Sequence, residues 1–338
     1  MTRISHFLDP RLYSEWRRRI VRGTLGPLRR IGDARLQQSV SVVDVHRVLI
    51  CRPNHRLGNL LLLTPLVQEL EQRLPNATID LAAAGDIAPE LFAGFQNVGR
   101  VYCLAHRIVR HLAATIRTLT EIRHAHYDWT IDPCLGSESG RFLALSAGAW
   151  GVLGFPRRSL VSAWDELDPL HGLPPHAAQM PVYLLRRALG CDYEHLRAPY
   201  PPLALRLSAV ERAAGRQALS DRLRRAAKPP AARTIVGVFA DATGAKRFPQ
   251  AWWRRFIAAL NLQRPDDAFV EVLPPDGRSP LAMDLPNFCS PSPRSVAAVV
   301  SGMTCFVSAD CGVMHLACAS GTPTIGLFSA SDVAKYGP

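Results

Sequence analysis

Two stretches of the chain alternate short apolar runs with helical patterns, and this alternation limits the fold more than any other feature. Between positions 46 and 132, four apolar runs are short enough to be buried strands, and amphipathic segments separate them. Strands that alternate with helices in this way pair in parallel, with helices on both faces of the sheet. The predicted strands are Arg47–Cys51, Thr78–Ala84, Val98–Leu104 and Trp129–Ile131, and the predicted helices are Leu60–Leu74 and His111–Arg123. The first helix could instead start at Thr64, with Pro65 at its first position, which would leave Asn59 in the preceding loop.

The same alternation restarts in the last third of the chain, after a helix that ends near Pro229 and Pro230. The predicted strands there are Thr234–Phe239, Ala268–Leu273, Cys305–Ser308 and Thr324–Phe328, and the predicted helices are Pro249–Leu260, Ser295–Ser301 and Met314–Ser320. We therefore expect an α/β protein of two doubly wound domains that face a central cleft. Because ligands of open α/β sheets bind beyond the carboxyl ends of the strands, function is expected at those ends.

The predicted domain boundaries follow from these two runs. An extension covers residues 1–45, the first domain 46–205, a linker region 206–231 and the second domain 232–338. The chain has 338 residues, of which 48% are hydrophobic and 20% charged, so it is neither a disordered chain nor a disulfide-stapled miniprotein. Two domains with cores of their own are the expected result.

Cysteine usage and hydropathy bear on metal binding and location. The eight cysteines form no CxxC pair and lie mostly in apolar runs, so we predict reduced thiols, no metal site and no cofactor. No run of about 18 apolar residues predicts a transmembrane helix, and the N-terminus lacks the apolar core of a secretory signal. A cytoplasmic protein is the expectation.

Positive charge is concentrated at the N-terminus. The chain has 40 Lys and Arg against 28 Asp and Glu, and residues 1–35 hold nine arginines against Asp9, Glu15 and Asp33. Apolar residues such as Leu12 and Trp16 interleave with the arginines at nearly helical spacing. Two interpretations stay open: a solvated helix docked on the body, or peripheral contact with the anionic inner membrane. Nucleic-acid binding is not expected, because no signature of such domains accompanies the charge.

Three polar turns directly follow predicted strands. In the first, Arg52 and Arg56 add charge and Gly58 permits close backbone approach, which suits an anion or acceptor site as well as an ordinary turn. In the second, Thr243, Gly244 and Lys246 could meet a phosphate, although a solvated turn lysine is the simpler interpretation.

The third turn has the most specific pattern. Asp310 could cap a helix, Gly312 would let the first turn of that helix approach a ligand, and His315 lies about one turn further on. The alternatives are a plain N-cap for Asp310 and a packing role for His315. A Gly321-Thr322-Pro323 exit to the next strand completes the segment.

With these motifs in family order, the chain resembles the ADP-heptose:lipopolysaccharide heptosyltransferases, glycosyltransferase family 9, over about residues 46–338. The resemblance rests on four segments: Arg52 to Asn59 with Thr64-Pro65, Tyr127 to Asp132, Lys246 to Pro249, and Asp310 to His315 with Gly321-Thr322-Pro323 and Leu327-Phe328.

The resemblance implies a GT-B fold of two Rossmann-like domains, with the acceptor on the first and the nucleotide-sugar donor on the second. It implies an inverting, metal-independent transfer of a heptose-like sugar from a nucleotide diphosphate to lipopolysaccharide or another surface glycan. The donor would contact Lys246, which also serves catalysis, together with Thr243, Gly244 and the segment of Asp310, Cys311, Gly312 and His315.

One departure concerns the catalytic base. The family has an aspartate after the glycine of the first turn, which deprotonates the acceptor hydroxyl, whereas this chain has Asn59. An amide cannot accept that proton at a useful pH. Another group such as His55, Asp86 or Asp241 could replace it, the acceptor could need little base help, or the protein could keep binding without transfer. A non-catalytic GT-B binding or scaffold protein is therefore the alternative function, and a sugar-nucleotide epimerase is a further one.

Overall fold

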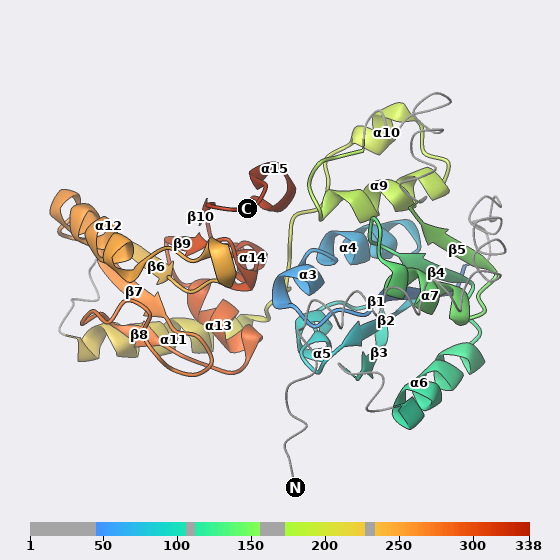
Figure 1. Ribbon diagram of the computed structural model, residues 1–338, viewed down its shortest axis with the longest axis horizontal. Helices are drawn as coiled ribbons and strands as arrows, with labels where there is room; N and C mark the ends of the chain where they lie inside the picture. Colours follow the sequence, from blue (N-terminus) through green and yellow to red (C-terminus); the bar gives the residue numbers. More distant parts are fainter. Residues whose placement is uncertain (1–44, 106–111, 156–172, 227–233) are drawn as a thin grey trace, which may run out of the picture.

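A computed structural model describes residues 45–105, 112–155, 173–226 and 234–338. The arginine-rich segment of residues 1–35, for which membrane contact is an open interpretation, lies outside these ranges, as does nearly all of the extension predicted for residues 1–45. Figure 1 shows two lobes, each built around its own sheet.

The first lobe contains a five-stranded sheet in the order β3-β2-β1-β4-β5, and every neighbouring pair is parallel. Its strands are β1 (Arg47–Arg52), β2 (Thr78–Ala84), β3 (Val98–Leu104), β4 (Trp129–Asp132) and β5 (Gly151–Gly154). The helices of this part of the chain are α3 (Leu57–Leu61), α4 (Thr64–Arg73), α5 (Ala88–Phe92), α6 (Leu112–His124), α7 (Glu138–Ser146), α9 (Gln179–Ala188) and α10 (Tyr193–Arg197).

The second lobe repeats the plan, with a parallel sheet in the order β10-β9-β6-β7-β8. Its strands are β6 (Ile235–Phe239), β7 (Ala268–Val272), β8 (Asn287–Phe288), β9 (Cys305–Ala309) and β10 (Thr324–Leu327). Its helical segments are α11 (Ala209–Arg225), the 3₁₀ turn η2 (Gly244–Lys246), α12 (Gln250–Gln263), α13 (Pro293–Val300), α14 (Gly312–Ser320) and α15 (Val333–Tyr336). Helix α11, inside the stretch predicted as a linker, packs on α13.

The strands have continuous apolar sequences because both faces of each sheet are buried. In β1, Val48 and Ile50 belong to one hydrophobic cluster, and Leu49 and Cys51 belong to another on the opposite face. A strand covered on both faces needs apolar residues at successive positions, which is the pattern of a doubly wound sheet. The cluster that holds Val48 also includes residues of the second lobe, such as Leu316, so the two lobes share a core.

The single helix predicted over Leu60–Leu74 is wrong in detail, because two helices occupy this region. Helix α3 ends at Leu61, and α4 begins at Thr64. Pro65 has no N–H, and its ring would clash with the carbonyl of Leu61 in a continuous helix. The Thr64 hydroxyl donates a hydrogen bond of 2.8 Å to that carbonyl instead. The break places Asn59 inside a short helix of its own.

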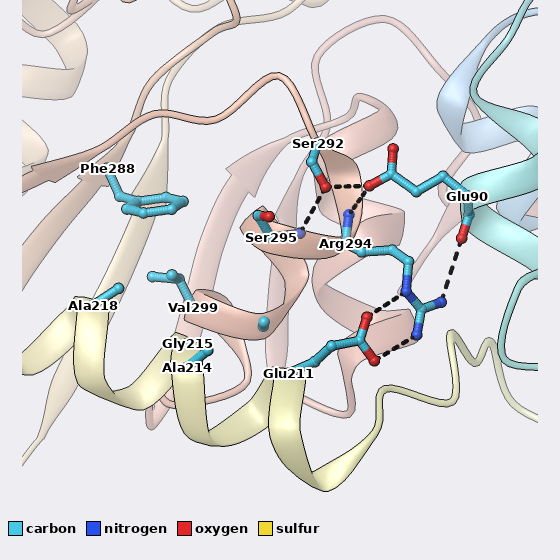
Figure 2. A pocket seen from close by; sticks show the side chains of 11 residues that line it. Glu90, Glu211, Ala214, Gly215, Ala218, Phe288, Ser292, Arg294, Ser295 and Val299 are labelled. Atoms are coloured by element: carbon cyan, nitrogen blue, oxygen red, sulfur yellow. Dashed lines mark hydrogen bonds and ion pairs between the residues drawn. The ribbon is translucent and has the colours of Figure 1, made fainter.

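Arg294 at the start of α13 joins the two lobes on the side shown in Figure 2. Its Nε and Nη2 donate to the carboxylate of Glu211 on α11 at 2.6 and 2.9 Å, and its backbone N–H donates to Glu90 of α5 at 3.1 Å. The hydrogen bonds from Arg294 lower the pKa of Glu211 to about 2. A cavity of about 480 Å³ lies beside this cluster. Within the described ranges, no helix is long and apolar enough to cross a membrane.

Candidate functional site

The strand order places one topological switch point in each lobe. In the first sheet the chain proceeds from β1 to β2 on one side and later adds β4 on the other, so the switch lies between β1 and β4. In the second sheet it lies between β6 and β9 for the same reason. Open α/β sheets bind ligands in the crevice outside such points. The three polar turns singled out in the sequence follow β1, β6 and β9.

At the switch of the second lobe, Lys246 and Asp310 form an ion pair with 2.6 Å between Nζ and Oδ2. Lys246 lies at the end of η2, a turn that Gly244 enters at a φ of +62°, which favours glycine. The lysine side chain is 35% exposed and the aspartate side chain only 4%, so the cation is accessible while the carboxylate lies behind it. Ser331 donates a further hydrogen bond to Asp310, and the ring of Tyr336 lies 5.6 Å from Nζ.

Asp310 does not cap α14, so the capping alternative left open by the sequence is wrong. Cys311 occupies the N-cap position of α14 and makes no side-chain cap hydrogen bond. Asp310 is turned toward Lys246 because the nearby cation attracts the carboxylate more strongly than the partial charge of a helix terminus. The side chain at the N-cap of α14 is therefore the Cys311 thiol and not a carboxylate.

His315 is buried one turn into α14. Burial lowers the pKa of His315 to about 4, and the nearby Asp310 only partly opposes that effect. The imidazole is thus neutral at neutral pH. Its Nδ1 is buried and has no hydrogen-bond partner, so packing alone does not satisfy this side chain.

Two glycines bring the lobes into contact at this point. A Cβ on Gly58 would lie 2.8 Å from Cδ2 of His315, and a Cβ on Gly312 would lie 3.0 Å from the backbone nitrogen of Gly58. Only residues without a side chain permit so close an approach of α3 to α14. The contact places Asn59, the next residue of α3, at the junction of the two lobes.

A cavity of about 280 Å³ lies beyond the carboxyl ends of β6 and β7. Asp241 borders it and pairs with Arg247, with 2.7 Å between Oδ1 and Nη2. The Arg247 guanidinium also donates to the carbonyl of Ala242 at 3.0 Å. The acidic residue is thus neutralised by a neighbour on its own turn.

The structure gathers some of the predicted site residues and separates others. Gly58, Gly312, His315, Asp310 and Lys246 form one connected set across the two lobes. Exposed positions hold Arg56 before α3, Thr243 before η2, and the candidate bases His55 and Asp86. Arg52 is partly buried at the end of β1, where Nη1 donates to the thiol of Cys134.

The sequence did not single out Asp132 as a functional residue. It ends β4 beside β1, its side chain is buried, and its Oδ2 has no hydrogen-bond partner. Burial raises the pKa of Asp132 to about 7, although Arg141 and Arg52 oppose the effect. In the sequence, Asp132 could be noticed only as the charged residue that directly follows the predicted strand Trp129–Ile131. Many strands end in a charged residue that has no function, so this position alone does not identify a functional site.

Comparison with known proteins bears on the family resemblance and on the fold. Residues 293–338, which include the Asp310 to His315 segment, match the model of glycosyltransferase family 9 (heptosyltransferase). No curated protein sequence matches the chain significantly.

Solved structures match over most of the chain. A glycosyl transferase family 9 protein from Veillonella parvula is 17% identical, with a TM-score of 0.68 over 89% of this chain and 85% of that one. E. coli heptosyltransferase WaaC with ADP is 20% identical, with a TM-score of 0.60 over 86% and 90%. E. coli ADP-heptose lps heptosyltransferase II is 16% identical, with a TM-score of 0.58 over 86% of each chain. The GT-B fold and the resemblance to family 9 are therefore confirmed.

Proposed function

We propose that the protein is an inverting glycosyltransferase that moves a heptose-like sugar from a nucleotide-diphosphate donor to lipopolysaccharide or another surface glycan. The observation that carries the proposal is the set of residues at the junction of the lobes. The N-terminus of α14 in the second lobe lies against the first polar turn of the other lobe, and the accessible Lys246 pairs with Asp310, which directly precedes that helix. This arrangement suits transfer of a group between substrates held on opposite lobes.

The second lobe has the chemistry that a nucleoside diphosphate needs. Lys246 offers a point charge and the N–H groups of α14 offer donors, and both can stabilise the charge that develops as the glycosidic bond breaks. The transfer proposed here is therefore metal-independent. Thr243 and Gly244 lie on the turn of Lys246, and Cys311 lies at the start of α14. The cavity of about 280 Å³, which Asp241, Arg247 and Phe248 help to line, could hold the nucleoside. An ADP complex of a structurally similar heptosyltransferase favours an adenine nucleotide.

Asp310 and His315 serve the donor site in different ways. Asp310 holds Lys246 in place through the 2.6 Å ion pair, and a diphosphate would then share the cation. A neutral His315 can donate or accept a hydrogen bond without adding charge. Gly312 lets α3 of the first lobe approach the start of α14, because a Cβ there would lie 3.0 Å from the backbone nitrogen of Gly58.

A donor panel tests the proposal. ADP-linked and UDP-linked sugars, including ADP-heptose, are incubated with the full chain, with and without a lipopolysaccharide-precursor acceptor, and nucleotide release is measured. We expect acceptor-dependent release of a nucleoside diphosphate with an ADP-linked sugar. A folded protein that releases nucleotide from no donor in the panel would contradict the transferase.

Asn59 favours the alternative, a GT-B binding or scaffold protein that no longer transfers sugar. Asn59→Asp separates the two, because it adds a carboxylate at the junction without a change in side-chain size. If another residue is the base, the wild type should turn over its substrates, and kcat should rise less than about threefold in the variant. If the protein has lost transfer activity, only the variant should turn over. Nucleotide binding measured by calorimetry is expected to be the same in both proteins.

Membrane contact through residues 1–35 is a separate part of the proposal and rests on their arginine content. Deletion of these residues is expected to move the protein from anionic vesicles to the unbound fraction in a sedimentation assay, and added salt should have the same effect on the full chain. Neutral vesicles are the control. Equal binding of the truncated and full chains to anionic vesicles would show that the arginines are only a solvated face.

A further inference from the structure

Two oppositely charged side chains end neighbouring strands at the switch point of the first lobe. Arg52 is the last residue of β1 and Asp132 the last residue of β4, and these strands pair in parallel. Arg52 and Asp132 thus occupy positions in the first lobe that correspond to those of Lys246 and Asp310 in the second. Lys246 follows β6 and Asp310 follows β9, the strands on either side of the second switch point. Unlike that pair, Arg52 and Asp132 are not hydrogen-bonded to each other.

Each of the two side chains has one buried polar atom without a partner. Asp132 Oδ1 accepts a hydrogen bond of 3.3 Å from the backbone N–H of Cys134, but Oδ2 accepts none. Arg52 uses Nη1 to contact the thiol of Cys134, but its Nε–H has no acceptor. Buried polar groups are nearly always paired. An unpaired donor and an unpaired acceptor at the carboxyl ends of two strands beside a switch point match a hydroxyl group, which can accept from Nε and donate to Oδ2.

We propose that Asp132 is the base that deprotonates the acceptor hydroxyl, with Arg52 orienting that hydroxyl, in place of the carboxylate that Asn59 lacks. The inference rests on the proposed function. The acceptor O–H bond breaks and its proton goes to Asp132 Oδ2. The oxygen then forms a bond to the anomeric carbon of the donor, the bond from that carbon to the diphosphate breaks, and the electron pair leaves with the nucleoside diphosphate, whose charge Lys246 stabilises.

The surroundings of Asp132 suit this role at neutral pH. The charged and titratable groups that act on it are Arg52 and Cys51 of β1, Cys134 in the following turn, and Arg141 and Glu138 of α7. Burial outweighs the two arginines and holds the pKa of Asp132 at about 7. A general base works best when its pKa lies near the working pH.

The other candidates fit less well. His315 lies on the lobe proposed for the donor, and burial lowers its pKa to about 4, which makes it a weak base. Asp241 also lies on that lobe and pairs with Arg247. His55 and Asp86 are exposed beside the first-lobe turns and lack the burial that would hold a proton acceptor in one geometry.

The test compares Asp132→Asn with the wild type, using the donor and acceptor that the wild type turns over. We expect kcat at pH 8 to fall by about 100-fold or more, with little change in the KM for the donor. The wild-type rate should rise with pH through about 7 as Asp132 loses its proton, and the variant should lack this rise. Asp221→Asn, which removes an exposed carboxylate of α11, is the matched control and should keep both the rate and the pH profile.

Two further measurements separate a catalytic role from a structural one. Asp132→Asn combined with Asn59→Asp should regain at least tenfold of the lost rate, because it restores a carboxylate at the junction. Difference infrared spectroscopy between pH 5 and 9 should show a protonated carboxyl that titrates near pH 7 in the wild type and is missing in Asp132→Asn. This readout does not depend on turnover.

The outcomes are distinguishable. Turnover by the wild type together with an unchanged rate and pH profile in Asp132→Asn overturns the role of Asp132 and leaves the proposed function intact. No turnover by the wild type overturns both. Should the variant not fold, as judged by circular dichroism, the wild type alone decides: the absence of a rate increase near pH 7 and of a titrating carboxyl would overturn the inference.

Discussion

We expect Lys246→Ala to lower kcat/KM for the nucleotide sugar by about 10²- to 10³-fold, the usual effect of removing one group that stabilises developing charge. Lys246 is an accessible cation at the switch point of the second lobe, and its ion pair with Asp310 holds it there. Its loss would also leave the buried carboxylate of Asp310 facing the diphosphate. Steady-state kinetics with the donor identified by the panel measure the effect.

Lys335→Ala is the control for this experiment. The Lys335 Nζ lies 5.5 Å from the ring of Tyr336, and the Lys246 Nζ lies at a similar distance from that ring. Lys246 forms an ion pair with Asp310, whereas Lys335 does not. The control should therefore change kcat/KM by less than about threefold. Lys246→Arg keeps the charge but changes its shape and should retain an intermediate rate. Equal rates for Lys246→Ala and Lys335→Ala would rule out a donor role for Lys246.

A second large effect is expected on stability. Arg186→Ala should lower the free energy of unfolding by about 3–5 kcal/mol, because it leaves the buried carboxylate of Glu69 without its main partner. The Arg186 Nε and Nη2 atoms donate to Glu69 at 2.8 and 3.0 Å, and its Nη atoms also donate to three backbone carbonyls between His195 and Pro199. These bonds tie α9 to α4, to α10 and to the residues directly after α10.

The pKa of Glu69 also depends on Arg186. Burial alone would raise this pKa, but the hydrogen bonds and charges of Arg186 and Arg73 hold it below the usual value. Urea unfolding followed by circular dichroism measures the loss in Arg186→Ala. Arg225→Ala, at an exposed position of α11, should change the free energy of unfolding by less than about 0.5 kcal/mol.

The double variant Glu69→Leu, Arg186→Met should recover much of the lost free energy of unfolding, because it leaves no buried charge without a partner. A single variant as stable as the control would contradict the account.

Most of the fold could be predicted because strand and helix patterns are local. The runs at Thr78–Ala84 and Val98–Leu104 coincide with β2 and β3, and the other predicted strands differ from the observed ones by a residue at an end. Two strands were missed for different reasons: β8 has only two residues, and β5 begins and ends with glycine, which is a poor strand former. The break between α3 and α4 depends on Pro65, whose ring would clash with the carbonyl of Leu61. The apolar pattern itself continues through this position and does not indicate a break.

The amino-acid sequence alone settles that the chain builds two parallel sheets and that polar turns follow β1, β6 and β9, because burial on both faces of a strand leaves its mark on successive residues. Which of those turns meet depends on contacts between residues far apart in the chain. The approach of Gly58 to His315, the pairing of Lys246 with Asp310, and the unpaired atoms of Arg52 and Asp132 arise only when separate strands are brought together. Long-range electrostatics and desolvation then act on groups whose neighbours no local pattern specifies.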